Sequence, residues 1–209
     1  MAPHEIALPD AKLHIQKLAS HFHKLSEPAL LEIRALKGGR AISRRFDPLN
    51  DLAVDTALSY ATGQNLDGYN VYITVNPVSA TGSPFSAAKD NDVVAATHIF
   101  LDADEPNVAE KLLEEFELGY DFIVVTGKEP HLRLHLYAAL EELQSDLLEW
   151  GQLMEQVISS HNCDKTAKNP SRIMRLAGFI SYPSENKIRK GYQLELVILY
   201  DKGDHHDFL

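Results

Sequence analysis

Two strand-like segments lie close together in this chain, and they restrict its fold more than any other feature. Residues 122–125 and 131–138 are rich in β-forming residues, and only residues 126–130 separate them. Elsewhere, strand patterns alternate with helical patterns. Strands that follow one another directly, combined with strands that alternate with helices, favour an α+β fold or a mixed sheet with helices on one side. The expected helices are 9–25, 50–61, 108–116 and 147–160, and the expected strands are 30–36, 70–75, 98–104, 122–125, 131–138 and 192–200.

Composition excludes several classes of protein. The 209 residues suffice for one domain or two small ones. The single cysteine, Cys163, excludes an internal disulfide and a zinc site built from cysteines, and it is typical of a reducing compartment. No apolar run approaches the roughly 18 residues of a membrane span, and residues 1–12 lack the pattern of a signal peptide. We therefore expect a soluble, cytoplasmic protein that does not associate with membranes.

Charge is distributed unevenly along the chain. The formal net charge is −10, which excludes a basic coat over the whole surface. Residues 33–46 nevertheless carry five basic residues and no acidic one, and residues 161–190 have a net charge of +5. These segments predict a confined anion-binding surface, with solvated loops as the alternative.

An acidic pair ends the strand expected at 98–104. Because side chains alternate along a strand, Asp102 and Asp104 are expected on one face, and Ile99, Leu101 and Ala103 on the core face. Neighbouring carboxylates repel each other, and hard divalent cations such as Mg²⁺ or Mn²⁺ relieve that repulsion. The pattern predicts a metal site, and a solvated strand end is the alternative.

The strand expected at 131–138 places three polar side chains on one face. Arg133, His135 and Tyr137 alternate with leucines, so we expect them to face outward, where they suit a triphosphate and a sugar. The turn before this strand offers backbone amides and Lys128 for a phosphate. A polar, solvent-facing surface is the alternative interpretation.

A third polar stretch follows the last expected long helix. Asp164 supplies another carboxylate, and Pro170 could open a helical turn that would bring Arg172 and Arg175 roughly onto one face. The alternative for these arginines is surface salt bridges.

Two histidine pairs are weaker metal candidates. His21 and His23 flank Phe22 in the pattern of rolling-circle nickases, but the surrounding apolar spacing predicts a helix, in which positions i and i+2 diverge. We therefore reject that interpretation. His205 and His206 lie in a charged tail and are expected to be solvated.

The three polar stretches together resemble the archaeo-eukaryotic primase superfamily, in its RepB-like or PrimPol-type branch from plasmids, phages and mobile elements. The resemblance runs from Asn70 to Tyr192 and preserves the order of the family's motifs. Ser181 in place of the usual asparagine, the long turn before His135 and the acidic balance of the chain depart from the family pattern. The matching stretches are Asp102-Ala103-Asp104, Thr126-Gly127, His135-Leu136-Tyr137, Asp164, the segment 172–178, Ser181-Tyr182-Pro183 and Lys187.

This resemblance implies a fold and a function. The fold would be a single primase-polymerase catalytic domain over 1–209, with an N-terminal α/β module at 1–69 and an RRM-like catalytic core at 70–209. The function would be a DNA primase and polymerase that uses nucleoside triphosphates and a single-stranded DNA template in replication. Asp102, Asp104 and Asp164 would hold two Mg²⁺ or Mn²⁺ ions.

The resemblance also implies nucleotide contacts. His135 and Arg172 would contact the phosphates, Arg175 would support them or contact the template, and Lys128 and Arg133 would be further contacts. A helical priming domain or a helicase would be a partner. Two alternatives remain: a non-catalytic primase-like replication initiator and a metal-dependent phosphodiesterase.

Overall fold

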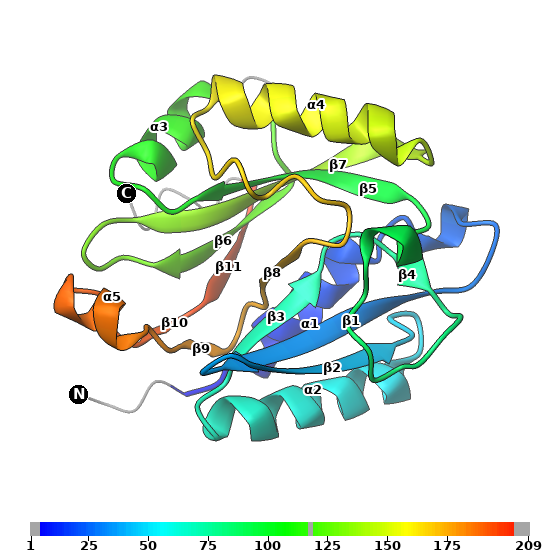
Figure 1. The fold of residues 1–209 in the computed structure, drawn as a ribbon, viewed down its shortest axis with the longest axis horizontal. Coiled ribbons are helices and arrows are strands. Elements are labelled where there is room, and N and C mark those ends of the chain that lie inside the picture. The colour runs from blue at the N-terminus through cyan, green and yellow to red at the C-terminus, as the bar shows by residue number, and fades with distance from the viewer. Residues whose placement is uncertain (1–4, 117–118, 203–209) are drawn as a thin grey trace.

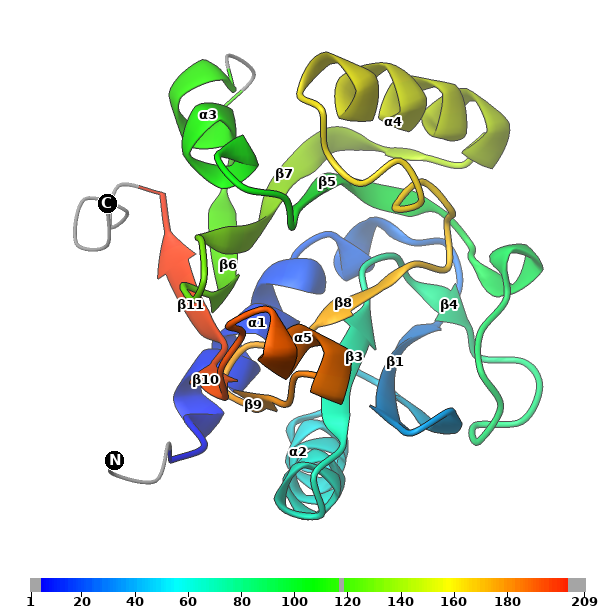
Figure 2. The same cartoon turned by 60° about the vertical axis from the view of Figure 1, so that its left-hand side comes forward.

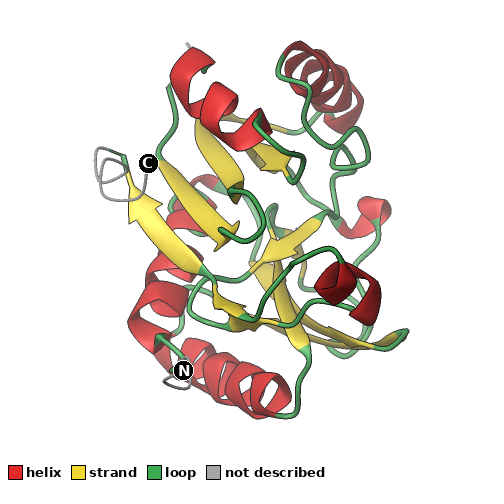
Figure 3. Cartoon of the chain, turned by 90° about the vertical axis from the view of Figure 1, so that its left-hand side faces the viewer, coloured by secondary structure: helices red, strands yellow, loops and turns green. Residues whose placement is uncertain are grey.

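The computed structural model describes residues 5–116 and 119–202, which form two antiparallel β-sheets flanked by helices (Figures 1 and 3). The first sheet has the order β2-β1-β3-β8, and β4 also pairs with β1. Its strands are β1 (Ala29–Lys37), β2 (Arg40–Phe46), β3 (Asn70–Thr74), β4 (Val78–Ser79) and β8 (Ile173–Arg175).

The second sheet carries the acidic strand and has the order β11-β6-β7-β5. All the strand pairs of both sheets are antiparallel. A two-stranded ribbon, β10-β9, connects the end of the first sheet to the last strand. The strands are β5 (Ala96–Ala103), β6 (Phe122–Gly127), β7 (Arg133–Gln144), β9 (Ile180–Ser181), β10 (Glu195–Leu196) and β11 (Ile198–Asp201).

Helices cover the outer sides of the two sheets (Figure 1). One long helix, α2, runs along the first sheet, and α3 and α4 lie on the second. The α-helices are α1 (Leu8–Leu18), α2 (Asp51–Leu66), α3 (Val108–Glu115), α4 (Leu147–Ser160) and α5 (Glu185–Arg189), and short 3₁₀ turns span Phe22–Lys24 and Asp90–Asp92.

Local sequence explains where the two longest helices begin. The side chain of Asn50 accepts a hydrogen bond from the Ala53 amide at the start of α2. The carboxylate of Asp146 accepts from the amides of Leu148 and Glu149 at the start of α4. Such caps satisfy backbone donors that have no partner within the helix.

One continuous apolar core joins both sheets. The second sheet is buried on both of its faces: Leu101 and Phe100, neighbours on β5, are both fully buried. Phe100 packs beside Trp150 of α4, and the Trp150 indole donates to the His98 carbonyl at 3.1 Å. On β7, Tyr137 stacks against Phe122 of β6 with ring centroids 4.4 Å apart.

The predicted α+β class and the eight central helix and strand predictions from 30–36 to 147–160 are confirmed, apart from their ends. The helix expected over 9–25 stops at Leu18, because the chain turns into the 3₁₀ segment at Phe22. The strand expected over 192–200 is split into β10 and β11. Strand β2 was not expected, since its residues are mostly basic and do not alternate clearly.

The helical turn expected at Arg172–Arg175 is wrong, because Ile173–Arg175 form strand β8 and pair with β3. The division at residue 69 stays a prediction. Strand β3 begins at Asn70 and pairs with β1 of the expected N-terminal module.

Two remaining predictions concern metals and membranes. His21 and His23 lie in and beside a 3₁₀ turn rather than a strand, in line with rejection of the nickase pattern. His205 and His206 lie outside the described residues. In the described part of the chain, no helix has the length and hydropathy needed to span a membrane.

Candidate active site

Asp102 and His135 lie directly opposite each other on β5 and β7, so both side chains point to the same face of the second sheet. The His135 Nε2 atom is 3.7 Å from Asp102 Oδ1. Burial, together with the negative charges of Asp104 and Asp164, raises the pKa of Asp102 to about 7 against the opposing effects of Arg172 and Arg175. The site therefore holds a carboxyl group whose charged form is disfavoured, chiefly by burial.

A backbone contact brings Asp164 to this pair. The Asp164 amide donates to the Asp102 carbonyl at 2.9 Å, which ties the loop after α4 to the end of β5. The Asp164 carboxylate accepts hydrogen bonds from the Thr166 amide at 2.9 Å and hydroxyl at 2.7 Å. Burial raises its pKa, but the Thr166 hydrogen bonds and the Arg172 guanidinium outweigh burial and hold the pKa below its usual value.

Arg172 bridges the two carboxylates. Its Nη2 atom is 3.1 Å from Asp164 Oδ2 and 3.7 Å from Asp102 Oδ2. Its Nε atom is buried and has no hydrogen-bond partner among the described residues. The guanidinium therefore occupies the position between Asp102 and Asp164 where their negative charges meet.

Asp104 is held by different cations. Its carboxylate lies 3.1 Å from Lys187 Nζ and 3.7 Å from Arg133 Nε. Within residues 5–116 and 119–202, no three histidine, cysteine, aspartate or glutamate side chains are grouped so that they could hold a metal ion. Asp104 and Asp164 lie near enough to Asp102 to raise its pKa, but each of the three carboxylates contacts a basic side chain and they do not form a metal-ligand group.

Arg133, His135 and Tyr137 share one sheet face, as expected, but the prediction that they face outward is wrong. All three are buried, because the inner face of the second sheet is covered by α1 and by the first sheet. His14 of α1 makes edge contacts with the rings of both Phe122 and Tyr137.

His135 is neutral in this setting. Burial lowers its pKa well below the usual value, and the positive charge of Arg175 is the next cause, followed by His14 and Arg172. Its Nδ1 atom and the Tyr137 hydroxyl are buried and have no hydrogen-bond partner within the described chain.

Arg133 is enclosed by protein groups. Its guanidinium contacts the Glu195 carboxylate at 2.8 Å and the Glu129 carbonyl at 2.6 Å, and it lies 4.3 Å from the centre of the Tyr192 ring. Gly127 makes room for it, since a Cβ atom there would overlap the guanidinium. These contacts give Arg133 a structural role at the end of the β6–β7 hairpin.

Lys128 and Arg175 lie at the margins of the site. Lys128 is exposed on the turn after β6, and its amide donates to Glu195. Arg175 faces Tyr72 across the β3–β8 pair, with its guanidinium 5.1 Å from the ring centre. Since Arg172 precedes β8 and Arg175 ends it, the two arginines do not share a helical face.

Sequence reasoning missed three residues that shape the site. Asn70 accepts a hydrogen bond from Arg175 at 2.7 Å, Thr166 orients Asp164, and Glu195 neutralises Arg133. Only Thr166 carries a local signal, because a threonine two residues after an aspartate commonly closes a turn onto its carboxylate. The other two act across long sequence separations.

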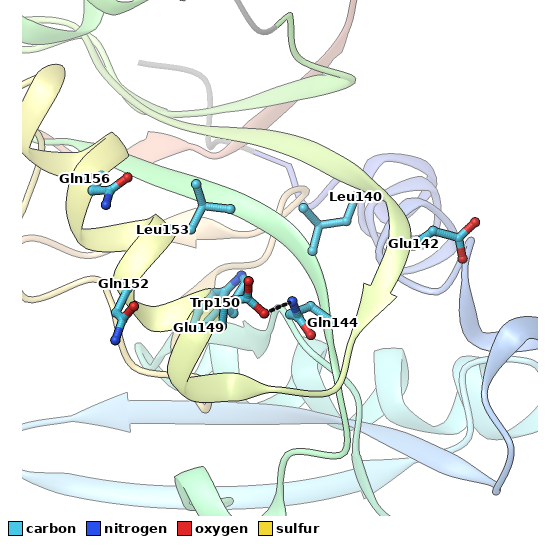
Figure 4. A pocket seen from close by; sticks show the side chains of 8 residues that line it. All are labelled: Leu140, Glu142, Gln144, Glu149, Trp150, Gln152, Leu153 and Gln156. Atoms are coloured by element: carbon cyan, nitrogen blue, oxygen red, sulfur yellow. Dashed lines mark hydrogen bonds between the residues drawn. The ribbon is translucent and has the colours of Figure 1, made fainter.

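A separate depression lies between α4 and the far end of β7 (Figure 4). Its volume is about 400 Å³, and Gln144 donates to Glu149 across it at 2.9 Å. None of the predicted site residues lines it. The lining residues are Leu140, Glu142, Gln144, Glu149, Trp150, Gln152, Leu153 and Gln156.

Comparison with known proteins identifies the fold. No protein-family model matches the chain, and no curated protein matches it. Solved structures do match, and they establish that the chain has the fold of a RepB-like, PrimPol-type primase catalytic domain.

Three solved structures illustrate this similarity. The AEP domain of the cyanophage S-2L primase-polymerase matches with a TM-score of 0.62 and 21% identity, over 93% of this chain and 90% of that one. Primase RepB′ matches with a TM-score of 0.57 and 14% identity, over 90% of this chain and 56% of that one. The catalytic domain of RepB′ has also been solved in complex with initiator DNA, and it matches with a TM-score of 0.56.

Proposed function

We propose that the chain is a DNA primase-polymerase catalytic domain that transfers nucleotides from nucleoside triphosphates to a growing strand. The observation that carries this proposal is the convergence of Asp102, Asp164, Arg172 and His135 at one end of β5, on a fold shared with primase-polymerases. Phosphoryl transfer depends mainly on positioning and on electrostatic stabilisation, and this cluster offers both.

The carboxylate chemistry of the site suits Mg²⁺ or Mn²⁺, and binding would require the three carboxylates to exchange their present basic partners, Arg172, Lys187 and Arg133, for the metal. Asp102, Asp104 and Asp164 supply carboxylate oxygens, which are the ligands these ions prefer. The pKa of Asp102 is raised first by burial and then by the neighbouring Asp104 carboxylate, and a divalent cation would stabilise its charged form. When bound, the metal would stabilise the charge that develops on the transferring phosphate.

The basic side chains would bind the nucleotide. Arg172 already lies between two carboxylates, and a planar guanidinium suits a phosphate equally well. His135 would donate its one ring N–H to a phosphate oxygen, as a hydrogen bond rather than an ion pair, because burial lowers its pKa well below the usual value. Arg175 lies close enough for its charge to lower the pKa of His135, and it would contact the nucleotide or the template. Lys128 on the exposed turn is the outermost candidate.

Single-stranded DNA is the proposed template. The RepB′ catalytic domain is known in complex with initiator DNA, which supports DNA as a partner here. A helicase or helical priming domain would be supplied by another segment or protein.

Nucleotide incorporation with Mn²⁺ tests this proposal. The wild-type protein, single-stranded DNA with and without a primer, and labelled NTPs or dNTPs would be compared with Asp102→Asn. We expect Asp102→Asn to lose at least about 100-fold of the incorporation rate, since it removes a charged ligand of the proposed metal ion, which would stabilise the transition state electrostatically. Asp55→Asn is the matched control, because Asp55 is exposed on α2 and contacts Lys12.

The outcomes separate the alternatives. Products made without a primer would establish a primase. Wild-type incorporation by Asp102→Asn would overturn the site. Manganese and DNA binding without any product would favour a non-catalytic replication initiator, and DNA that becomes shorter would favour a metal-dependent phosphodiesterase.

A further inference from the structure

The turn between β1 and β2 places two positive charges side by side. Lys37 and Arg40 are directly opposite each other in the β1–β2 ladder, and only Gly38 and Gly39 connect them. Both glycines have positive φ, 55° and 81°, as a tight hairpin turn requires. Like charges in directly opposed strand positions destabilise a sheet, so this pair is unfavourable by itself.

No carboxylate compensates this pair in the described chain. On the same two strands, Arg34 and Arg45 are paired with Glu32 and Asp92, and Arg44 packs over the rings of Tyr60 and Phe85. Lys37 instead donates to the Asp67 carbonyl and lies over the Tyr69 ring, 5.5 Å from its centre. In a chain with a net charge of −10, an uncompensated cationic pair is a specific feature of this hairpin.

The cationic pair borders an open groove of about 410 Å³. Three of its lining residues are glycines, so the backbone is accessible along much of it. The remaining lining residues come from β1, from β3 and from the segment that follows β9, which lies beside β3 (Figure 2). The lining residues are Leu36, Lys37, Gly38, Gly39, Arg40, Gly68, Asn70, Tyr182, Pro183 and Ser184.

Asn70 connects this groove to the candidate active site. Its side-chain oxygen accepts from the Tyr182 amide at 2.8 Å and from Arg175 Nη1 at 2.7 Å. Arg175 in turn lies over Tyr72, and its positive charge acts on both His135 and Asp102. A strand that leaves the cluster past Arg175 would therefore enter the groove at Asn70.

We infer that this groove, closed at one side by Lys37 and Arg40, binds the phosphate backbone of single-stranded DNA as it leaves the active site. The inference rests on the proposed function, because it assumes that a DNA strand occupies the site. Phosphates would compensate the opposed charges of the hairpin, and the Tyr182 ring at the groove wall would suit contact with a base. We expect the groove to bind DNA without sequence preference, since phosphate charge and a stacking surface are common to all four nucleotides.

Salt-dependent binding of a labelled single-stranded oligonucleotide tests the inference. The variant Lys37→Ala/Arg40→Ala would be compared with Lys12→Ala/Lys111→Ala, which removes the same charge from surface positions on α1 and α3. Removing two phosphate contacts should lower the slope of log affinity against log salt by about 1.4, because each contact on a single strand contributes about 0.7. The affinity deficit of the groove variant should then shrink about sevenfold between about 50 and 200 mM salt. The control pair should keep the wild-type slope.

Three further measurements make the result decisive. The melting temperature of Lys37→Ala/Arg40→Ala should equal or exceed that of the wild type, since a repulsion is removed. Lys37→Arg/Arg40→Lys should restore DNA binding. Binding of a single dNTP or of inorganic triphosphate should be unchanged in the groove variant, which separates a strand site from a nucleotide site.

The inference is overturned if both double variants lose DNA affinity equally, if neither does, or if the groove variant loses triphosphate binding to the same extent. Failure of the proposed function has a different signature. In that case the wild-type protein would make no product with Mn²⁺, even though its β1–β2 hairpin is unchanged.

Discussion

The amide of Asp164 donates a hydrogen bond to the carbonyl of Asp102, and this contact brings two distant segments into one site. It holds both carboxylates within reach of one guanidinium, that of Arg172, at 3.1 and 3.7 Å. The strand end thus supplies one acidic side chain, and the loop after α4 supplies both the second and its basic partner.

Arg172 should be the most sensitive basic residue of the site. Arg172→Ala should lower nucleotide incorporation by about 100-fold or more, because it removes a fixed positive charge beside the reacting phosphate. Arg172→Lys should recover only part of the rate, since an ammonium cannot contact both carboxylates or a phosphate in a bidentate manner. Steady-state incorporation measures both variants, and a rate for Arg172→Ala within twofold of wild type would contradict the assignment.

Glu195 should matter for stability. Its carboxylate neutralises Arg133, whose side chain is only 5% exposed. Glu195→Ala would leave that guanidinium buried without its carboxylate, and we expect a loss of about 3 kcal/mol in the free energy of unfolding. Urea unfolding of the variant and the wild type measures this difference in the free energy of unfolding. Glu155→Ala, which removes an exposed ion pair with Lys168, should leave the free energy of unfolding close to that of the wild type, because surface pairs contribute little.

Two glycines should respond oppositely to alanine. Gly127→Ala would push a Cβ atom into the Arg133 guanidinium and should destabilise the fold by about 1–3 kcal/mol. Gly151→Ala, in α4 with no atom within 4 Å of the new Cβ, should stabilise it by up to about 1 kcal/mol, as expected for an open helical position. Thermal unfolding of both variants tests this prediction, and equal changes in melting temperature would contradict the close packing at Gly127.

Stability should fall as the pH is lowered from 7 towards 4. Burial lowers the pKa of His14 and of His98 to about 3, with smaller contributions from neighbouring positive charges. The histidines of the unfolded chain therefore bind protons as the pH falls through about 6.5, whereas those of the folded chain stay unprotonated. This contribution to the free energy of unfolding is fully present above about pH 6.5 and is lost progressively below it. Each histidine should contribute up to about 1.4 kcal/mol per pH unit.

The variant His14→Asn isolates one of these histidines. Asparagine could keep the acceptor for the Ala177 amide, which His14 Nδ1 provides at 3.2 Å. Urea unfolding at pH 7, 6 and 5 should show a shallower pH dependence than wild type, and the exposed His23→Asn should leave it unchanged. An unaltered slope in His14→Asn would contradict a neutral, buried His14.

Strand and helix positions were largely predictable because they depend on local patterns. The alternating residues of β5 and β7 and the apolar spacing of α4 identify these elements without any tertiary information. Strand β8 was not predictable, because three residues carry no period and pairing with β3 decides their conformation.

The sequence by itself determined which chemical groups are present: the carboxylates of Asp102, Asp104 and Asp164, and the order in which the basic residues follow them. Only the tertiary structure decided how those groups are paired. Arg133 forms an ion pair with Glu195, whereas Arg172 lies between Asp102 and Asp164. The physical reason is that burial and charge pairing arise between segments far apart in the chain, and these interactions set both the accessibility of a cation and the pKa of a carboxylate.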